Sequence, residues 1–207
     1  MRIRANITAT SVIAALSIIA GCTDNKRPGC IMPDETVVKP GDVAFRKGTG
    51  VASHAVTLAD EDADYSHCGI VVTCGGKAMV VHAVPDEPDF DGDKDRVKME
   101  PVSEFFSTIK ASKGCIMRFT NSTTANRSAT AAMETYLRGT LFDHDYDDKD
   151  TTKLYCSELV EHVYRKNGVA LSGGSRHDIN LPGLKFRHVI FPSDFLKSGK
   201  LAHVCSF

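Results

Sequence analysis

The chain reads SHCGIVVTCGGKAMVVHA from Ser66 to Ala83, which is the pattern of a β-hairpin. Two runs of β-branched and apolar residues flank Gly75 and Gly76, and glycine readily adopts the positive φ angles that tight hairpin turns need. Antiparallel pairing of the two runs brings His67, at the start of the first, close to His82, near the end of the second. The hairpin therefore predicts two imidazole side chains at one place.

A second stretch, LYCSELV from Leu154 to Val160, puts a cysteine where a helix is expected to begin. The unpaired N–H groups and the dipole of a helix N-terminus favour negative charge, so the pKa of such a cysteine is often lowered to roughly 3.5 to 7.5. Most free cysteines are merely buried and inert. A nearby base with a second polar group to orient it, which His67 and His82 can supply, favours a nucleophile.

These two segments resemble a known family of enzymes. The hairpin, with His-x-Gly-Ile and a closing His-Ala, is similar to the histidine segment of the NlpC-type cysteine peptidases, a papain-like group acting mostly on bacterial cell-wall peptides. In that family the cysteine helix comes first, whereas Cys156 follows the hairpin here, so the order resembles the circularly permuted branch that includes the YiiX/YebB-like hydrolases. Further matches are Gly41-Asp42-Val43-Ala44-Phe45 and Phe191-Pro192-Ser193-Asp194-Phe195-Leu196, so the resemblance spans about residues 40 to 205.

The resemblance implies a fold and a set of roles. The fold is α+β, a circularly permuted papain-like (NlpC-type) arrangement with an antiparallel sheet packed against helices. Cys156 is the implied nucleophile, His67 the general base, and His82 the residue that orients His67. Tyr155 stands where the ordinary family usually has an aspartate, and Tyr155 and Ser157 are the candidate substrate-binding residues.

The expected reaction is hydrolysis of an amide or peptide bond without a cofactor. The Cys156 thiolate attacks the carbonyl, the N–H of Cys156 stabilises the oxyanion, and His67 protonates the leaving group before water hydrolyses the thioester. The leading substrate is a peptidoglycan stem peptide or a related acyl-amino-acid.

Three alternatives stay open at this point. Lipid acyltransferases and phospholipases of the lecithin–retinol type also resemble a histidine hairpin followed by a cysteine helix. Two histidines and one cysteine are acceptable zinc ligands, although we assign no metal because a cysteine at a helix start favours a nucleophile. The third alternative is an inactive module that binds a ligand in the papain-like groove.

The N-terminus predicts a bacterial lipoprotein. Arg2 and Arg4 precede an apolar stretch from Ser11 to Ala20 that is too short to span a bilayer of about 30 Å, and Ile19-Ala20-Gly21-Cys22 resembles a lipoprotein processing site. We therefore expect a signal peptide over residues 1–21, lipidation of Cys22, a tether over 22–39 and the hydrolase domain over 40–207. The expected location is the bacterial cell envelope, with the lipid anchor in a membrane. An ordinary secretory signal is the alternative.

Composition limits the remaining classes of function. An apolar fraction of 42%, a charged fraction of 25% and a net charge of −1 fit one globular domain and give no electrostatic case for nucleic acid. We expect a monomer.

The chain has seven cysteines. Lipidation and catalysis take two of them, and the other five cannot all form disulfides with one another; their connectivity is open. These others are Cys30, Cys68, Cys74, Cys115 and Cys205.

The rest of the chain predicts a mixture of strands and helices. Strands are expected near residues 43–45, 115–119, 189–191 and 201–204, and helices near 102–109 and 125–138, from Cys156 to about Asn167, and from Ser193 as N-cap. An acidic loop should cover 85–96. The acidic run from Asp143 to Asp150 lacks the glycine and glutamate of an EF-hand, because Asp148 and Leu154 occupy those positions, so it predicts a solvated loop.

Overall fold

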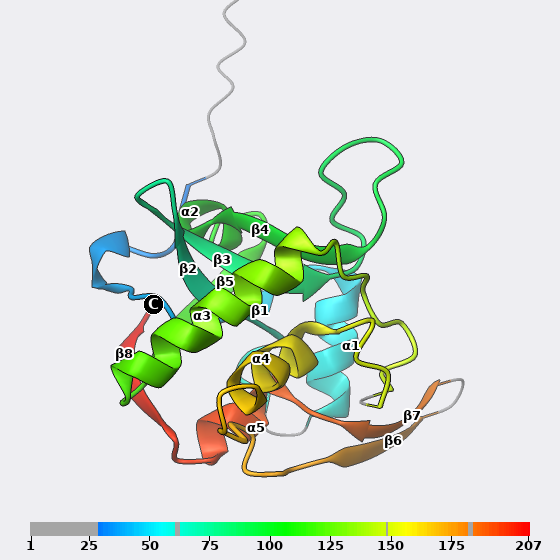
Figure 1. Ribbon diagram of the computed structural model, residues 1–207. Coiled ribbons are helices and arrows are strands. Elements are labelled where there is room, and N and C mark those ends of the chain that lie inside the picture. The colour runs from blue at the N-terminus through cyan, green and yellow to red at the C-terminus, as the bar shows by residue number, and fades with distance from the viewer. Residues whose placement is uncertain (1–28, 61–62, 148, 182–183) are drawn as a thin grey trace, which may run out of the picture.

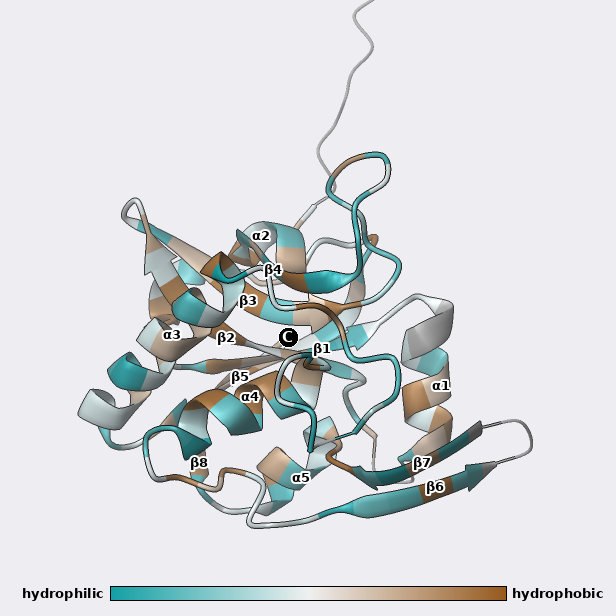
Figure 2. Cartoon of the chain, turned by 45° about the vertical axis from the view of Figure 1, so that its right-hand side comes forward, coloured by the Kyte–Doolittle hydropathy of each residue, from teal (hydrophilic) through white to brown (hydrophobic). Residues whose placement is uncertain are grey.

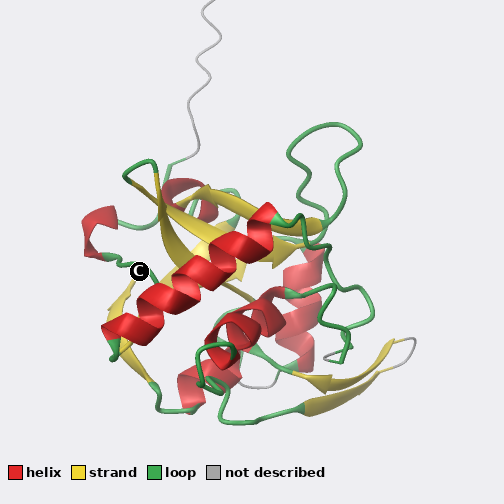
Figure 3. Cartoon of the chain, viewed as in Figure 1, coloured by secondary structure: helices red, strands yellow, loops and turns green. Residues whose placement is uncertain are grey.

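The computed structural model describes residues 29–60, 63–147, 149–181 and 184–207, and its centre is a six-stranded sheet (Figure 1). The strand order is β4-β3-β2-β1-β5-β8, and all neighbours are antiparallel. Helices cover one face of this sheet, and the hairpin of β6 and β7 projects beside them (Figure 3). The expected α+β fold, an antiparallel sheet packed against helices, is confirmed.

Strands and helices are intermixed along the chain. The strands are β1 (Val43–Gly48), β2 (His67–Cys74), β3 (Lys77–Val84), β4 (Arg96–Pro101), β5 (Ala111–Phe119), β6 (His177–Leu181), β7 (Leu184–Val189) and β8 (Leu201–Ser206). The helices are a 3-10 turn (Glu35–Val37), α1 (Val51–Ala59), α2 (Val102–Phe105), α3 (Ser122–Leu137), α4 (Cys156–Arg165) and α5 (Pro192–Lys197).

The predicted hairpin forms as β2 and β3. Pairing runs from Ile70 opposite Val81 to Cys74 opposite Lys77, and both turn glycines have positive φ, 56° at Gly75 and 75° at Gly76. Gly69 lets the two strands approach closely, since a Cβ there would lie 2.6 Å from a methyl of Val80. The hairpin thereby fixes the positions of the histidines at its open end.

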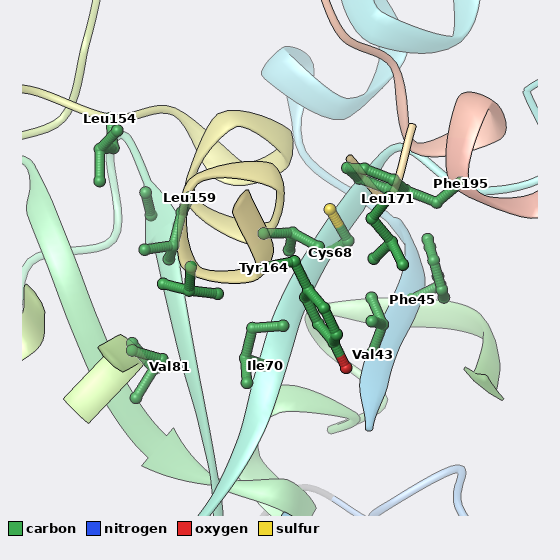
Figure 4. Close-up of a cluster of buried hydrophobic side chains, with 14 of the residues drawn as sticks. Val43, Phe45, Cys68, Ile70, Val81, Leu154, Leu159, Tyr164, Leu171 and Phe195 are labelled. Atoms are coloured by element: carbon green, nitrogen blue, oxygen red, sulfur yellow. The ribbon is translucent and has the colours of Figure 1, made fainter. Parts of the chain in front are cut away.

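Strand alternation divides the core between the two faces of the sheet. Val43 and Phe45 face α3 and α4, whereas Ala44 belongs to a smaller cluster with α2 on the opposite face. Helix α4 buries an apolar stripe that includes Leu159 and Tyr164, shown against β1 and β2 in Figure 4, and its polar side is turned outward in Figure 2. This packing holds the first turn of α4 against the sheet.

Some predicted boundaries were wrong. The strand predicted at 189–191 lies at 184–189 instead, because β7 ends at Val189 and the following residues lead into α5. Ser193 is not the N-cap of α5, which begins at Pro192 with Phe191 as N-cap. Proline fits the first helical position because its missing N–H has no partner there. Helix α2 also ends at Phe105, four residues before the predicted end.

Four elements had no counterpart in the sequence predictions: the 3-10 turn, α1, β4 and β6. Helix α1 lies beside the β6–β7 hairpin, and its hydrophobic residues contrast with the mostly hydrophilic hairpin in Figure 2. The segment between β1 and β2 received no predicted structure, although six of the nine residues of α1 are Val, Ala or Leu. Both α1 and the hairpin contribute to the cavity described below.

The domain extends further towards the N-terminus than the expected boundary at residue 40. Met32 is buried, and the N–H of Ile31 donates to the carbonyl oxygen of Phe106 at 2.9 Å. The expected signal peptide and the lipidated Cys22 lie outside the described residues. Within the described ranges, no helix combines the length and apolar character needed to cross a membrane.

Candidate active site

Cys156 is the first residue of α4, as the sequence predicted. The N-cap, Tyr155, has extended backbone angles and makes no side-chain cap to the first turn. The thiol is partly exposed and lines a cavity. The helix N-terminus therefore presents a thiol and first-turn N–H groups to the same space.

His67 and His82 are brought together by the hairpin. The Nε2 atom of His67 lies 2.9 Å from Nδ1 of His82, and both side chains are buried. The two residues are diagonal neighbours in the β2–β3 register rather than directly opposite. His67 is also hydrogen-bonded to the thiol of Cys156. The three residues that the sequence selected thus form one connected chain.

Glu100 of β4 extends this chain and was missed in the sequence. Its Oε1 lies 3.2 Å from Nε2 of His82 and 3.6 Å from Nη1 of Arg46, while its Oε2 lies 2.5 Å from Nζ of Lys110. Burial opposes its ionisation, but the contacts with His82 and Lys110 outweigh burial and lower the pKa of Glu100 to about 2. The carboxylate is therefore charged over the whole neutral range.

In contrast to Glu100, His82 favours its uncharged form. Burial disfavours its charged form and lowers its pKa to about 4, even though Glu100 acts in the other direction. His82 is accordingly a neutral imidazole near pH 7. With its single ring proton on Nε2, the atom that lies 3.2 Å from the Glu100 carboxylate, His82 has Nδ1 available to accept the Nε2–H of His67.

A second thiol lies against Cys156. Cys68 follows His67 on β2 and is fully buried, and the two cysteines are hydrogen-bonded to each other. The hydrogen bond from Cys68, with that from His67 and the charge of His67, lowers the pKa of Cys156 well below the ordinary thiol value against the effect of burial. Burial and the neighbouring Cys156 raise the pKa of Cys68. Cys156 is thus the thiolate of the pair.

Ser157, a predicted substrate-binding residue, contacts both sulfurs. Its Oγ lies 3.7 Å from Sγ of Cys68 and 3.8 Å from Sγ of Cys156. The residue is buried, although part of it lines the cavity. Its hydroxyl therefore lies within reach of both thiols.

The cavity in front of Cys156 has a volume of about 620 Å³. Most of its wall is apolar, and α1 contributes Val56 and Ala59 to it, while the β6–β7 hairpin contributes Ile179 and Phe186. Its polar wall includes charged side chains of both signs, among them Arg46, Glu87 and Lys110. The thiol therefore faces a space that suits an apolar group with a polar end.

Two tyrosines form the wall beside Cys156. Tyr155, the other predicted substrate-binding residue, lines the cavity. Its hydroxyl oxygen accepts the N–H of Ile190 at 2.8 Å, so the side chain also stabilises the backbone before α5.

Tyr146 was not predicted as a site residue because it lies in the acidic run. Its ring contacts Tyr155 and Phe186, with centroid separations of 4.9 and 4.6 Å, and burial together with nearby Cys156 raises its pKa to about 12.

The acidic run is a loop, as expected, but not a wholly solvated one. Asp143 is buried, and its two carboxylate oxygens accept the N–H groups of Asp145 and Asp147. Asp143 thus shapes the loop that carries Tyr146. Throughout the part of the chain that the structure describes, no group of three or more histidine, cysteine, aspartate or glutamate side chains is arranged to hold a metal ion.

Comparison with known proteins identifies the family and the fold. Residues 37–205 match the family described as permuted papain-like amidase enzyme, YaeF/YiiX, C92 family. The fold is similar to a solved structure described as metalloprotein yiiX from Escherichia coli, with a TM-score of 0.65 and 21% sequence identity over 82% of this chain and 97% of that chain. A search of curated proteins gave no match.

Proposed function

Because the chain belongs to the permuted papain-like amidases of the YaeF/YiiX group, and is therefore a cysteine hydrolase, we propose that Cys156 is its nucleophile and His67 its general base. The supporting observation is the continuous contact from Cys156 through His67 and His82 to Glu100. His82 orients His67, and Glu100 acts one step further out, as a positioning residue for His82.

The proton positions follow from these contacts. With Nε2 of His67 bonded to His82, Nδ1 is the ring nitrogen that remains available to the thiol. His67 takes the thiol proton on Nδ1 and keeps its Nε2–H, which donates to Nδ1 of His82. His82 in turn donates from Nε2 towards Glu100, so the carboxylate stabilises the imidazolium through a neutral histidine.

The covalent steps are those of a thiol hydrolase. The Cys156 thiolate attacks the substrate carbonyl, and the backbone N–H of Cys156 stabilises the oxyanion at the helix N-terminus. His67 returns its proton to the leaving amine, and water, with its proton taken by His67, cleaves the thioester.

For the substrate, we propose an amide that joins an apolar acyl group to an amino acid. The apolar walls on α1 and the β6–β7 hairpin suit the acyl group. The charges of Arg46, Glu87 and Lys110 suit the carboxylate or amine of an amino acid. A peptidoglycan stem peptide is polar along its length and would leave most of the apolar wall without a partner, so we rank it second among amides.

The apolar wall also favours one other activity, cleavage or transfer of an acyl group from a lipid ester. The same acyl chain would occupy the cavity, and only the leaving group would differ. Release of fatty acid from phospholipid vesicles, compared with release from N-acyl amino acids at matched chain length, separates the two activities.

A metal-dependent mechanism does not fit these residues. The relative from Escherichia coli is described as a metalloprotein. In this chain His67 and His82 direct ring nitrogens at each other across 2.9 Å, so these two atoms cannot both be aimed at one ion. No step is therefore assigned to a metal.

For the location, the proposal follows the N-terminal sequence. Its basic residues, short apolar stretch and Cys22 support a lipid anchor in a bacterial envelope membrane, with the hydrolase acting as a monomer beside that membrane. Detergent partitioning and intact mass of the chain made in bacteria test this. A Cys22→Ala chain that stayed in the membrane fraction would contradict the anchor.

The nucleophile is tested by alkylation of the purified chain with limiting iodoacetamide from about pH 5 to 8, with each cysteine read by peptide mass spectrometry. We expect selective labelling of Cys156 at pH 5 that is lost in His67→Ala. His144→Ala, which removes a histidine whose side chain is 62% exposed, is the matched control. Labelling of Cys156 no faster than that of exposed Cys74 would overturn the assignment.

A further inference from the structure

Cys68 has no step in the proposed reaction, yet its thiol is held against the nucleophile. It is fully buried on β2 and does not line the cavity. Figure 4 shows it among the hydrophobic side chains between the sheet and α4. Burial alone would suit any small apolar residue, so the position of its sulfur is the informative feature.

The sulfurs of Cys68 and Cys156 share one hydroxyl neighbour. Ser157 Oγ lies 3.7 Å from the first and 3.8 Å from the second, and Cys156 packs against the buried cluster that contains Cys68. All six cysteines in the described residues are free thiols. The two thiols are thus not joined by a disulfide, and both lie against the same hydroxyl group.

Access to the two sulfurs differs. Cys156 lines the cavity and is reached from solvent, whereas Cys68 lies behind it. An oxidant entering the cavity meets the thiolate of Cys156 first. The buried thiol can react only with what forms on Cys156, which is the arrangement of an oxidisable cysteine beside a resolving cysteine.

We propose that Cys68 is the resolving thiol of a reversible oxidation site, forming a disulfide with Cys156 when a hydroperoxide oxidises the nucleophile. The inference rests on the proposed function in one respect, that Cys156 is the reactive thiolate. The expected location in the envelope, where disulfides persist, makes such chemistry relevant to the enzyme.

Two steps account for all atoms and electrons. The Cys156 thiolate attacks the terminal oxygen of the hydroperoxide, the O–O bond breaks, and the departing alkoxide or hydroxide takes up a proton, which leaves Cys156 as a sulfenic acid. The sulfur of Cys68 then attacks the sulfenic sulfur. The S–O bond breaks, the S–S bond forms, and the Cys68 proton leaves with the hydroxyl group as water.

The disulfide has two consequences for the enzyme. It removes the nucleophile and stops hydrolysis until a dithiol reduces it. It also blocks further oxidation of Cys156 to the sulfinic acid, which ordinary thiols do not reverse. Proximity offsets the weak intrinsic nucleophilicity of the buried Cys68 thiol, because the attack is intramolecular.

The test treats the purified full chain with hydrogen peroxide and maps its peptides without reduction. A portion is then reduced with dithiothreitol, and the share of Cys156 that reacts again with iodoacetamide is measured. The variants are Cys68→Ala and, as matched control, Cys115→Ala. Cys115 is also buried, and it faces Phe45 from β5 as Cys68 does from β2.

We expect a peptide linked through Cys68 and Cys156 in the wild type and in Cys115→Ala, with Cys156 labelling restored by dithiothreitol. In Cys68→Ala, Cys156 should proceed to the sulfinic acid, and the restored share should fall at least about fivefold. Absence of the linked peptide in the wild type, or equal restoration in Cys68→Ala, would overturn the inference. Fast labelling of Cys156 before oxidation with no linked peptide afterwards would reject this inference alone. Slow initial labelling would reject the proposed nucleophile.

Discussion

The Nε2 atom of His82 lies 3.2 Å from Oε1 of Glu100, so the third residue of the proposed triad is held by a carboxylate from the next strand of the sheet. The register places Glu100 two positions from the residue opposite His82, which is the diagonal spacing at which long side chains meet. The same carboxylate contacts Lys110 and Arg46, which hold it in place. The orientation of the base thus depends on a third strand as well as on the hairpin.

Replacing Glu100 by Gln should impair catalysis more than binding. The amide cannot stabilise the imidazolium, so we expect kcat to fall by about 10- to 100-fold while KM changes less than about twofold. The alkaline limb of the pH–activity profile should also shift to lower pH, because the charged form of His67 is less stabilised. Steady-state kinetics from pH 5 to 9 measures both effects.

Glu104→Gln is the matched control, because Glu104 is 45% exposed and also lies near Lys110. A Glu100→Gln enzyme with unchanged pH limits and a raised KM would show that Glu100 contributes to binding instead.

Replacing Cys156 by Ala should abolish turnover without unfolding the domain. The side chain is only partly buried, so we expect the melting temperature to change by less than about 3 °C, while kcat falls by about a thousandfold or more. Cys74→Ala, at an exposed cysteine, should keep full activity. Hydrolysis by Cys156→Ala within tenfold of the wild type would reject the mechanism.

Stability should fall between pH 6.5 and pH 4 because of His82. Its pKa is about 4 in the folded chain, against 6.5 for the free side chain, so the unfolded state binds the proton first as the pH falls. The contribution is fully present above pH 6.5 and is lost as the pH approaches 4. Linkage gives a loss of about 2 kcal/mol of unfolding free energy from pH 7 to pH 5.

Urea unfolding of the wild type, His82→Gln and His144→Gln at these two pH values tests the prediction. His82→Gln should lose most of the pH dependence, whatever its stability at pH 7, whereas removal of the exposed His144 should not. Equal pH dependence in all three chains would mean that another group is responsible.

Acyl chain length should control the specificity constant. Each methylene buried against the apolar wall contributes about 0.8 kcal/mol, so kcat/KM for N-acyl amino acids should rise about fourfold per methylene until the cavity is full. Phe186→Ala should weaken this dependence, and Phe90→Ala, at a phenylalanine that is 63% exposed, should not. Rates independent of chain length would count against an acyl substrate.

The hairpin, the start of α4 and the long α3 were predictable because each has a strong local pattern. Glycines with positive φ mark the hairpin turn, and the apolar period of α4 identifies its buried stripe. The contact between His67 and His82 followed from pairing alone. These features depend on residues close together in sequence.

What could not be predicted depends on distant residues. Glu100 meets His82 only because β4 adds to the edge of the hairpin, and nothing in the local sequence distinguishes it from other acidic residues. The apolar wall joins α1 to the β6–β7 hairpin across more than 100 residues of chain. Tyr146 could not be predicted as a site residue, because the acidic sequence around it favoured a solvated loop. In the structure, the buried Asp143 carboxylate accepts two backbone N–H groups of this loop and so determines its path.

The consecutive strands β2, β3 and β4 carry His67, His82 and Glu100, whereas α1 and the β6–β7 hairpin carry part of the apolar wall. The residues proposed to move protons and the surface proposed to bind the acyl group therefore occupy different parts of the chain. Substitutions, or even insertions, in α1 or the hairpin can accumulate without displacing a ring nitrogen of the relay. The fold thus lets substrate preference diverge among related proteins while the chemistry stays constant, and it marks α1 and the β6–β7 hairpin as the segments to exchange in engineering a new specificity.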